Sequence, residues 1–370
     1  MGEPQSSETI PVSATATIPQ TDAALGIEVP VSRIDHELRL LWEQDEARSN
    51  ASLINLVVYS EQSGALGRNS GVIRELTRDH ACRAILVEMD RSVEEPTVRA
   101  WITAHCHLSH GLKSVCCEQI ALHFTGRAKG RLRNTVFAHL NADLPVVFWW
   151  QGRLSGVFDE RMASAIDRFI FDSSAWPDAA EGFDMLREIH HRSNGRMILQ
   201  DLAWTRVWHF RQCLARLFDD AVAHDAIPSI RRIDIRHHPE HRHSALLVIA
   251  WLATRAGWDL AGDGRFANPS GGAIEWTASA DPGACILGGI GIEAEGVRIR
   301  VDCSPGCSHF HGQIISTRGH EVKTVSPADP SNCQDLVAEQ LSRAGRNTLY
   351  QQILPLFLTL LHPPTTPTNP

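Results

Sequence analysis

The stretch SLINLVVYS at residues 52–60 is followed by GRNSGVIRELTRD at residues 67–79 and by CRAILVEM at residues 82–89. The first and third stretches are apolar and rich in β-branched residues, which predicts buried strands. The middle stretch repeats apolar residues with the spacing of one helix face. A strand, a helix and a strand in this order predict a parallel pair joined by a right-handed crossover.

The same alternation continues along the first half of the chain. Residues 144–150 and 168–172 are short apolar stretches that predict two further buried strands. Residues 97–108 and 114–125 predict two longer strands that form an antiparallel addition. We therefore predict an α/β first domain over residues 31–195, with a mainly parallel sheet and helices.

The second half of the chain has a different pattern. Residues 201–220, rich in Trp and Arg, predict one long helix that bridges the two halves. Short stretches that predict strands follow. Two of them, residues 286–294 and 297–302, are joined by the turn-forming pair Glu295-Gly296. We predict an α+β second domain over residues 196–361, with a mainly antiparallel sheet backed by helices.

Composition limits the classes of function. The 370 residues are 43% hydrophobic and carry a formal net charge of -8, which argues against a nucleic-acid or anionic membrane partner. No apolar run approaches the roughly 20 residues that cross a bilayer. Residues 1–30 contain no Lys or Arg and no secretory signal, so we expect a cytoplasmic protein. Residues 1–30 and 362–370 predict a disordered and a flexible tail.

The glycines after the first strand do not form a nucleotide-binding motif. Gly64, Gly67 and Gly71 have the spacing G-x-x-G-x-x-x-G, which differs from the dinucleotide fingerprint. Asp90 follows the second strand but does not close it in the expected way. A strand-to-helix turn that needs small residues explains the glycines better than a cofactor site does. We expect no cofactor.

Two clusters of metal-ligand residue types lie in the second half. Four histidines surround Pro239 in a polar connection, where solvated side chains are the default: His237, His238, His241 and His243. A C-x3-C-x-H-x-H array is formed by Cys303, Cys307, His309 and His311. This array is compatible with structural zinc, with a redox-responsive thiol pair or with an ordinary strand connection. We expect no metal and keep Cys303 and Cys307 as candidate redox thiols.

The nine cysteines show no regular framework, so a reducing compartment predicts mostly free thiols. Cys116 and Cys117 are adjacent on a predicted strand and point to opposite faces, which predicts one buried thiol and one outside the core.

Trp149 and Trp150 close another strand. Either both indoles pack under helices, or one is presented to a partner, since Trp is enriched in binding hot spots.

Several motifs together resemble one family. They are NLVV at residues 55–58, DHACRAI at 79–85, CCEQI at 116–120, DLPVVFWW at 143–150, DRFIFDSS at 167–174, WHFR at 208–211 and GW at 257–258. In this order they resemble the glucose-6-phosphate dehydrogenase assembly protein family, OpcA. The resemblance covers roughly residues 31–360, and the DLPVVFWW and DRFIFDSS pair is its most specific part.

The resemblance implies a non-catalytic assembly factor or allosteric activator that binds glucose-6-phosphate dehydrogenase and regulates the oxidative pentose phosphate pathway. It also implies a link to redox control of that enzyme. Because aromatic and arginine side chains dominate protein interfaces, our candidate partner-binding residues are Arg83, Trp150, Arg168, Trp204 and Arg211. No catalytic residue is expected.

A second hypothesis is a sugar-phosphate-binding sensor or enzyme. Its pocket would lie at the strand ends of the first domain, at Ser60, Asp90 and Asp172, with Arg83 or Arg168 holding a phosphate. Ser173 and Ser174 are expected to cap the segment that follows Asp172.

Overall fold

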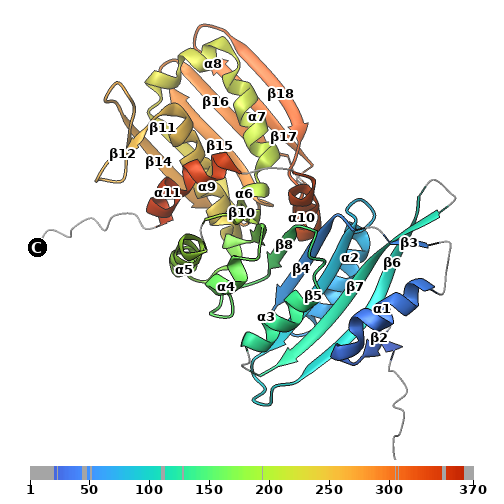
Figure 1. Cartoon of the computed structure of the whole chain (residues 1–370). Coiled ribbons are helices and arrows are strands. Elements are labelled where there is room, and N and C mark those ends of the chain that lie inside the picture. Colours follow the sequence, from blue (N-terminus) through green and yellow to red (C-terminus); the bar gives the residue numbers. More distant parts are fainter. Residues whose placement is uncertain are drawn as a thin grey trace, which may run out of the picture.

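The structure is a computed structural model of the chain, and it describes residues 21–361 apart from residues 23, 44–47, 51, 110–112, 127–128, 194, 305, 307 and 344–346. Two β-sheets and the helices packed on them form the described part (Figure 1). The predicted C-terminal tail and residues 1–20 lie outside the described residues. The predicted N-terminal tail is too long, because strand β2 (Gly26–Val29) pairs with β6 (Val98–Ser109).

The first sheet, called sheet A, has the strand order β1-β2-β6-β7-β5-β4-β8-β9-β10, with β3 beside β7. Neighbouring strands run parallel from β7 to β10. The remaining strands of sheet A are β1 (Thr21–Asp22), β3 (Arg48–Asn50), β4 (Ile54–Ser60), β5 (Cys82–Asp90), β7 (Lys113–Thr125), β8 (Val146–Trp150), β9 (Arg168–Phe171) and β10 (Ile198–Asp201).

The parallel strands follow the order of a doubly wound fold. When the strands β4, β5, β7, β8, β9 and β10 are numbered 1 to 6 along the chain, their spatial order in the sheet is 3-2-1-4-5-6. In folds with this order, ligands bind at the carboxyl ends of the strands, where the order reverses. That reversal lies between β4 and β8. The predicted α/β class is confirmed, and so is the antiparallel addition, because β6 runs antiparallel to β7.

Helices cover sheet A on both faces, which is why β4 and β5 are buried almost throughout. Helix α2 joins β4 to β5 as the crossover expected from the sequence. The helices of this half are η1 (Val31–Arg33), α1 (Ile34–Glu43), α2 (Ala65–Leu76), α3 (Lys129–Ala138), α4 (Glu160–Ala163), η2 (Ser173–Ala175) and α5 (Ala179–Arg192).

The second sheet, called sheet B, has the order β12-β13-β14-β11-β15-β16-β17-β18. All neighbouring strands are antiparallel except β11 and β14, which confirms a mainly antiparallel second sheet. The strands are β11 (Arg232–His237), β12 (Asp259–Leu260), β13 (Phe266–Ala267), β14 (Ala273–Ala280), β15 (Leu287–Ala294), β16 (Val297–Cys303), β17 (His309–Ser316) and β18 (Glu321–Pro327).

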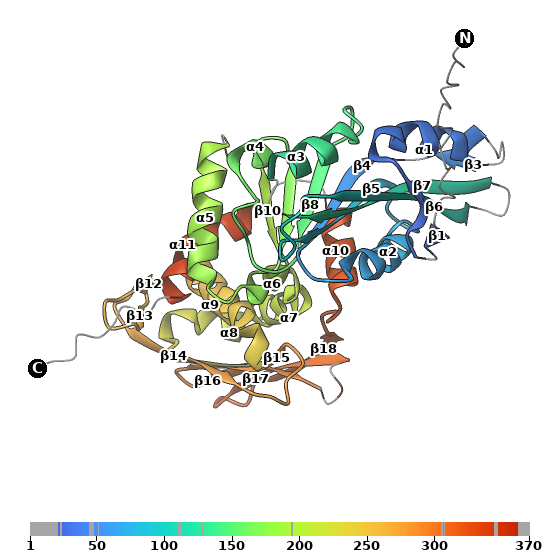
Figure 2. The ribbon, with the colours of Figure 1, turned by 90° about the horizontal axis from the view of Figure 1, so that it is seen from below.

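A layer of helices separates the two sheets (Figure 2). One apolar cluster includes the inner face of sheet B, these helices and much of sheet A, so the halves share a core. Helix α10 belongs to a second apolar cluster, in which Leu336 and Val337 pack with α2 and sheet A. The helices of the second half of the chain are α6 (Leu202–Thr205), α7 (Trp208–Phe218), α8 (Ala221–Asp225), η3 (Ile227–Ser229), η4 (Pro239–His241), α9 (Arg242–Ala256), α10 (Cys333–Ser342) and α11 (Thr348–Leu361).

The predicted helix over residues 201–220 is wrong in its details. Asp201 ends β10 and caps the short helix α6, after which α7 begins at Trp208. Strand β10 belongs to sheet A, so that sheet extends past residue 195, where the sequence places the domain boundary. Since α10 also returns to sheet A, the second half of the chain does not pack as a separate unit.

Candidate functional site

The carboxyl ends of β4, β5 and β8 form the edge of sheet A at which a doubly wound fold binds a dinucleotide. In such a fold the free backbone N–H groups at the start of the first helix hold the phosphates. Here that helix is α2, and Gly64 precedes it with φ of 72°. The side chains around Gly64 therefore decide whether this edge can bind a phosphate.

The carboxylate of Glu88 occupies the start of α2. One of its oxygens accepts a hydrogen bond from the Gly64 backbone N–H at 3.1 Å, and the other accepts one from the Leu66 N–H at 3.0 Å. Glu88 lies near the end of β5 and is only 7% exposed. A buried carboxylate on these donors satisfies them and repels a phosphate. The sequence prediction missed Glu88 because it considered Asp90 instead.

Large side chains lie at the neighbouring ends of β4 and β8. The rings of Tyr59 and Trp150 stack with their centroids 4.1 Å apart, and the Trp150 indole N–H donates to the Arg153 carbonyl at 3.0 Å. Asn69 of α2 and Gln151 exchange two amide hydrogen bonds of 3.1 and 2.8 Å. The polar groups of these side chains therefore already have partners within the chain.

A second polar group lies farther along the same edge, after β9. Arg206 donates to both oxygens of Asp172, at 3.3 and 2.5 Å. His241 is close to this ion pair, and burial together with Arg206 lowers its pKa to about 4. A neutral imidazole with so low a pKa is a weak base at pH 7, so it suits acid–base catalysis poorly. This group is better suited to hold the junction together.

Asp201 and Tyr350 join the end of sheet A to helix α11. The Asp201 carboxylate is fully buried and accepts hydrogen bonds from the Ser173 N–H, the Ala203 N–H and the Tyr350 hydroxyl. Burial is the main reason that its pKa is raised to about 6, with a further contribution from Asp172. Burial likewise raises the pKa of the Tyr350 hydroxyl. The site couples three elements and shows no open face for a substrate.

The strand ends named for a sugar phosphate do not converge on one pocket. Asp90 bends back to accept hydrogen bonds from the N–H and hydroxyl of Ser92. Ser60 accepts one from the Gln62 N–H. Asp172 is held by Arg206 and accepts a hydrogen bond from the Ser174 N–H, so Asp172 itself caps the next segment. The expectation that Ser173 and Ser174 cap it is wrong, because neither buried hydroxyl has a hydrogen-bond partner among the described residues.

The structure uses Arg83 and Arg168 to connect secondary-structure elements. The Arg83 guanidinium forms ion pairs of 2.9 Å with both Asp35 and Glu118. Arg168 reaches the Gln340 carbonyl of α10 at 3.5 Å. Both side chains are half-buried, and their role in partner binding stays a prediction.

The expectation that Trp150, Trp204 and Arg211 are exposed anchors is wrong, because all three are at least 95% buried. The Arg211 guanidinium lies 3.3 Å from the centre of the Trp204 ring, and burial lowers its pKa to about 9. A cation–π contact of this kind compensates the charge for lost hydration. These residues stabilise the layer between the sheets.

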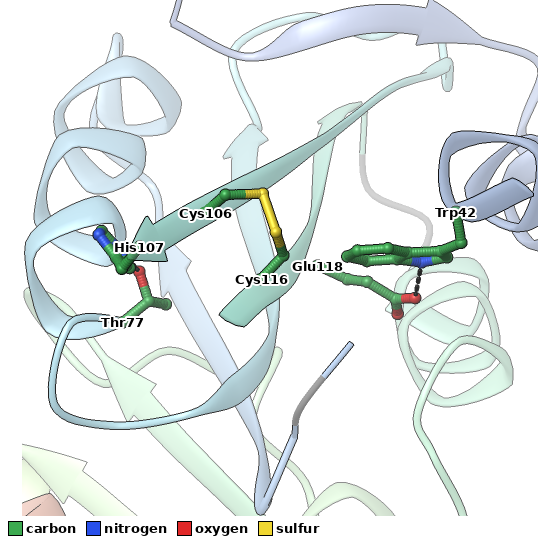
Figure 3. The surroundings of a disulfide bond; sticks show 6 residues. All are labelled: Trp42, Thr77, Cys106, His107, Cys116 and Glu118. Atoms are coloured by element: carbon green, nitrogen blue, oxygen red, sulfur yellow. Dashed lines mark hydrogen bonds between the residues drawn. A yellow bond between two sulfur atoms is a disulfide. The ribbon is translucent and has the colours of Figure 1, made fainter. Parts of the chain in front are cut away.

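The cysteines differ from the predicted pattern. Cys106 and Cys116 form a disulfide across strands β6 and β7 (Figure 3). Cys117 is buried as well as Cys116, so the prediction of one thiol outside the core is wrong. The spacing missed the disulfide because the register of the two strands decides which residues are opposite.

The candidate redox pair cannot be placed, because Cys307 lies outside the described residues. Cys303 is half-buried, and its pKa is raised by burial and by Asp329, which makes the thiol less reactive. His309 and His311 are both exposed on sheet B. Among the described residues, no three His, Cys, Asp or Glu side chains are placed to hold a metal ion.

Comparison with known proteins gives two family matches. Residues 73–188 match the family domain described as the glucose-6-phosphate dehydrogenase subunit N-terminal domain, and residues 197–354 match the corresponding C-terminal domain. In the described part of the chain, no helix has the length and apolarity needed to cross a membrane.

Two relatives are cyanobacterial proteins named OxPP cycle protein OpcA. The one from Synechocystis is 24% identical over 79% of this chain and 66% of its own length, and the one from Nostoc punctiforme is 25% identical over 78% and 67%. The chain thus spans about two thirds of these relatives.

A solved structure of an aldose-aldose oxidoreductase from Caulobacter crescentus is similar with a TM-score of 0.44 and 10% identity, over 84% of this chain and 98% of that one. The two consecutive domain matches decide the family: the chain belongs to the OpcA family of glucose-6-phosphate dehydrogenase assembly proteins.

Proposed function

We propose that this chain is a non-catalytic partner of glucose-6-phosphate dehydrogenase, which it binds and whose assembly or activity it changes. The Glu88 carboxylate on the start of α2 carries the non-catalytic part of the proposal. This carboxylate accepts hydrogen bonds from the backbone N–H groups that the phosphates of a nicotinamide dinucleotide would need. The strand order of sheet A is that of dinucleotide-binding proteins. The family match supports the identity of the partner.

Such a partner acts by preferring one state of the enzyme. It shifts an equilibrium only by the difference between its affinities for the two states. If it binds the active or assembled dehydrogenase more tightly, it raises the population of that state, and substrate in turn raises the affinity for this chain. The effect requires no bond-making chemistry by the chain itself.

The proposal is tested by mixing the purified chain with its cognate dehydrogenase. We expect the two proteins to co-elute in size-exclusion chromatography. Separate elution over a range of micromolar concentrations would remove the proposed partner. Running the chromatography with and without reductant tests the implied link to redox control.

A thermal-shift assay of the chain alone separates this proposal from a sugar-phosphate sensor. We expect no change in melting temperature with NADP⁺, NADPH or glucose 6-phosphate at millimolar concentration. Stabilisation by one of these ligands without the dehydrogenase would favour the sensor, because ligand binding to the folded state raises its stability.

A further inference from the structure

One face of sheet B is free of described secondary structure. In Figure 2 the helices α7, α8 and α9 lie on the side that faces sheet A, and no described element crosses the opposite side. Side chains alternate accordingly along β11, where Ile233 and Ile235 are fully buried and Arg232 and Arg236 are exposed. We call the side that carries Arg232 and Arg236 the open face.

The strand register identifies the other side chains of the open face, because residues directly opposite each other in a sheet project to the same side. Arg232 is opposite both Glu275 and Glu293, and Glu293 is opposite Arg298. Continued across the sheet, the charged members are Arg232, Asp234, Arg236, Glu275, Glu293, Arg298, Arg300, Asp302, Glu321 and Lys323.

These ten side chains comprise five cations and five anions, and Asp281, which pairs with Arg236 at 3.2 Å, adds one anion at the margin. The open face is therefore close to neutral in a chain of net charge -8. The two signs alternate and form ion pairs within the face, among them Arg236 with Asp302 at 2.9 Å and Arg298 with Glu293 at 3.3 Å. A second copy of the chain would be repelled by much of the surface but not by this face.

The open face also has a central hollow and two exposed apolar side chains. Gly291 lies at its centre, in a hollow of about 220 Å³ that is lined by Asp234, Arg236 and Arg300 among others. Two exposed large apolar side chains lie on neighbouring strands of the same face, Ile315 at 42% and Val325 at 62% exposure.

The area is sufficient for a stable dimer. Six strands from β14 to β18 at about 4.8 Å spacing, each about 25 Å long, span roughly 700 Å². Standard interfaces bury roughly 600–1,000 Å² on each partner, so the whole open face falls within this range. In a two-fold dimer the same patch meets itself, which requires both charge signs on one surface. We propose that the open face of sheet B is the contact between two copies of this chain.

The test is the mass of the full chain in solution, with a variant that blocks the face. A Cβ added to Gly291 would meet no atom within 4 Å, so Gly291→Trp is compatible with the fold but projects a large side chain from the centre of the face. Gly67→Trp is the matched control, since Gly67 is exposed on α2 and equally free of neighbours.

In analytical ultracentrifugation we expect a mass of 2 × 40.9 = 81.8 kDa for the wild type and for Gly67→Trp. Gly291→Trp should sediment at 40.9 kDa with an unchanged circular dichroism spectrum. A monomeric wild type, or a Gly291→Trp variant that remains dimeric, would overturn the proposal.

The measurement needs no dehydrogenase, so its result is independent of the proposed function. If the wild type alone is monomeric and Gly291→Trp loses binding to the dehydrogenase, the face contacts the enzyme and the proposed self-association is wrong.

Discussion

At the scale of single residues, three carboxylates connect the starts of helices to other parts of the chain. Glu88, Asp201 and Asp329 each accept hydrogen bonds from backbone N–H groups at the start of a helix. Such contacts stabilise a helix terminus by about 1 kcal/mol each. Because the partners of Glu88 and Asp329 are distant in sequence, these contacts also fix how elements pack. The pKa values of Asp201 and Asp329 record the cost of their burial.

The raised pKa of Asp201 predicts a specific pH dependence. A carboxyl group whose pKa is about 6 when folded and about 4 when unfolded binds its proton more tightly in the folded state. The contribution of Asp201 to stability is therefore lost as pH rises from about 4 to 6, by about 3 kcal/mol, and this contribution changes no further above pH 7.

Urea unfolding of the wild type and of Asp201→Asn measures this effect. The variant lacks the titrating group, so the difference between the two free energies of unfolding should change between pH 4.5 and 7. The contribution of Asp329 is present in both proteins and cancels. A difference that is constant with pH would show that Asp201 does not titrate in this range.

A Glu88→Ala substitution tests whether this carboxylate closes the phosphate position. Removing it frees the Gly64 and Leu66 N–H groups. We expect a loss of about 1 kcal/mol in stability and a rise in melting temperature on adding inorganic phosphate, which the wild type should not show. Glu75→Ala on the same helix is the control. If the variant also ignores phosphate, then another feature of the edge excludes anions.

At the scale of elements, the strand β6–β7 ribbon is cross-linked near its end. The two cysteines of the Cys106–Cys116 disulfide are 10 residues apart in sequence. Strand β7 pairs with β5, which lies in the centre of sheet A. A neighbouring hydrogen bond of 3.0 Å between Thr77 and His107 links the ribbon to the end of α2 (Figure 3).

Removing this cross-link should destabilise the protein moderately. For a loop of this length the entropic contribution is at most about 3 kcal/mol. We expect Cys106→Ser to lower the free energy of unfolding by up to that amount in non-reducing buffer. In contrast, unchanged stability of the variant would mean that the thiols are not bonded in solution.

The sequence predicted those elements in which apolar residues recur at a regular spacing within one short stretch. The stretches around β4, α2 and β5 were placed within a few residues because strand and helix periodicities differ clearly there. It did not predict that Glu88 reaches Gly64, or that Arg211 lies between indoles. These contacts depend on tertiary packing, and an arginine is assumed to be exposed until a partner ring is known.

At the scale of the whole molecule, the two sheets share a helix layer and one apolar cluster. Sheet A has the architecture of a dinucleotide-binding domain, but its own side chains occupy the position of the phosphates. Sheet B leaves a balanced, charged face uncovered by described elements. These two features are what the proposed binding to other protein chains rests on.

The most direct test of this account is a titration of the chain into a fixed amount of its glucose-6-phosphate dehydrogenase while initial rates are measured. We predict a saturable change in KM for glucose 6-phosphate or in kcat, with no rate from the chain alone. Dehydrogenase kinetics that stay constant at saturating concentrations, or turnover by the highly purified chain by itself, would contradict the account.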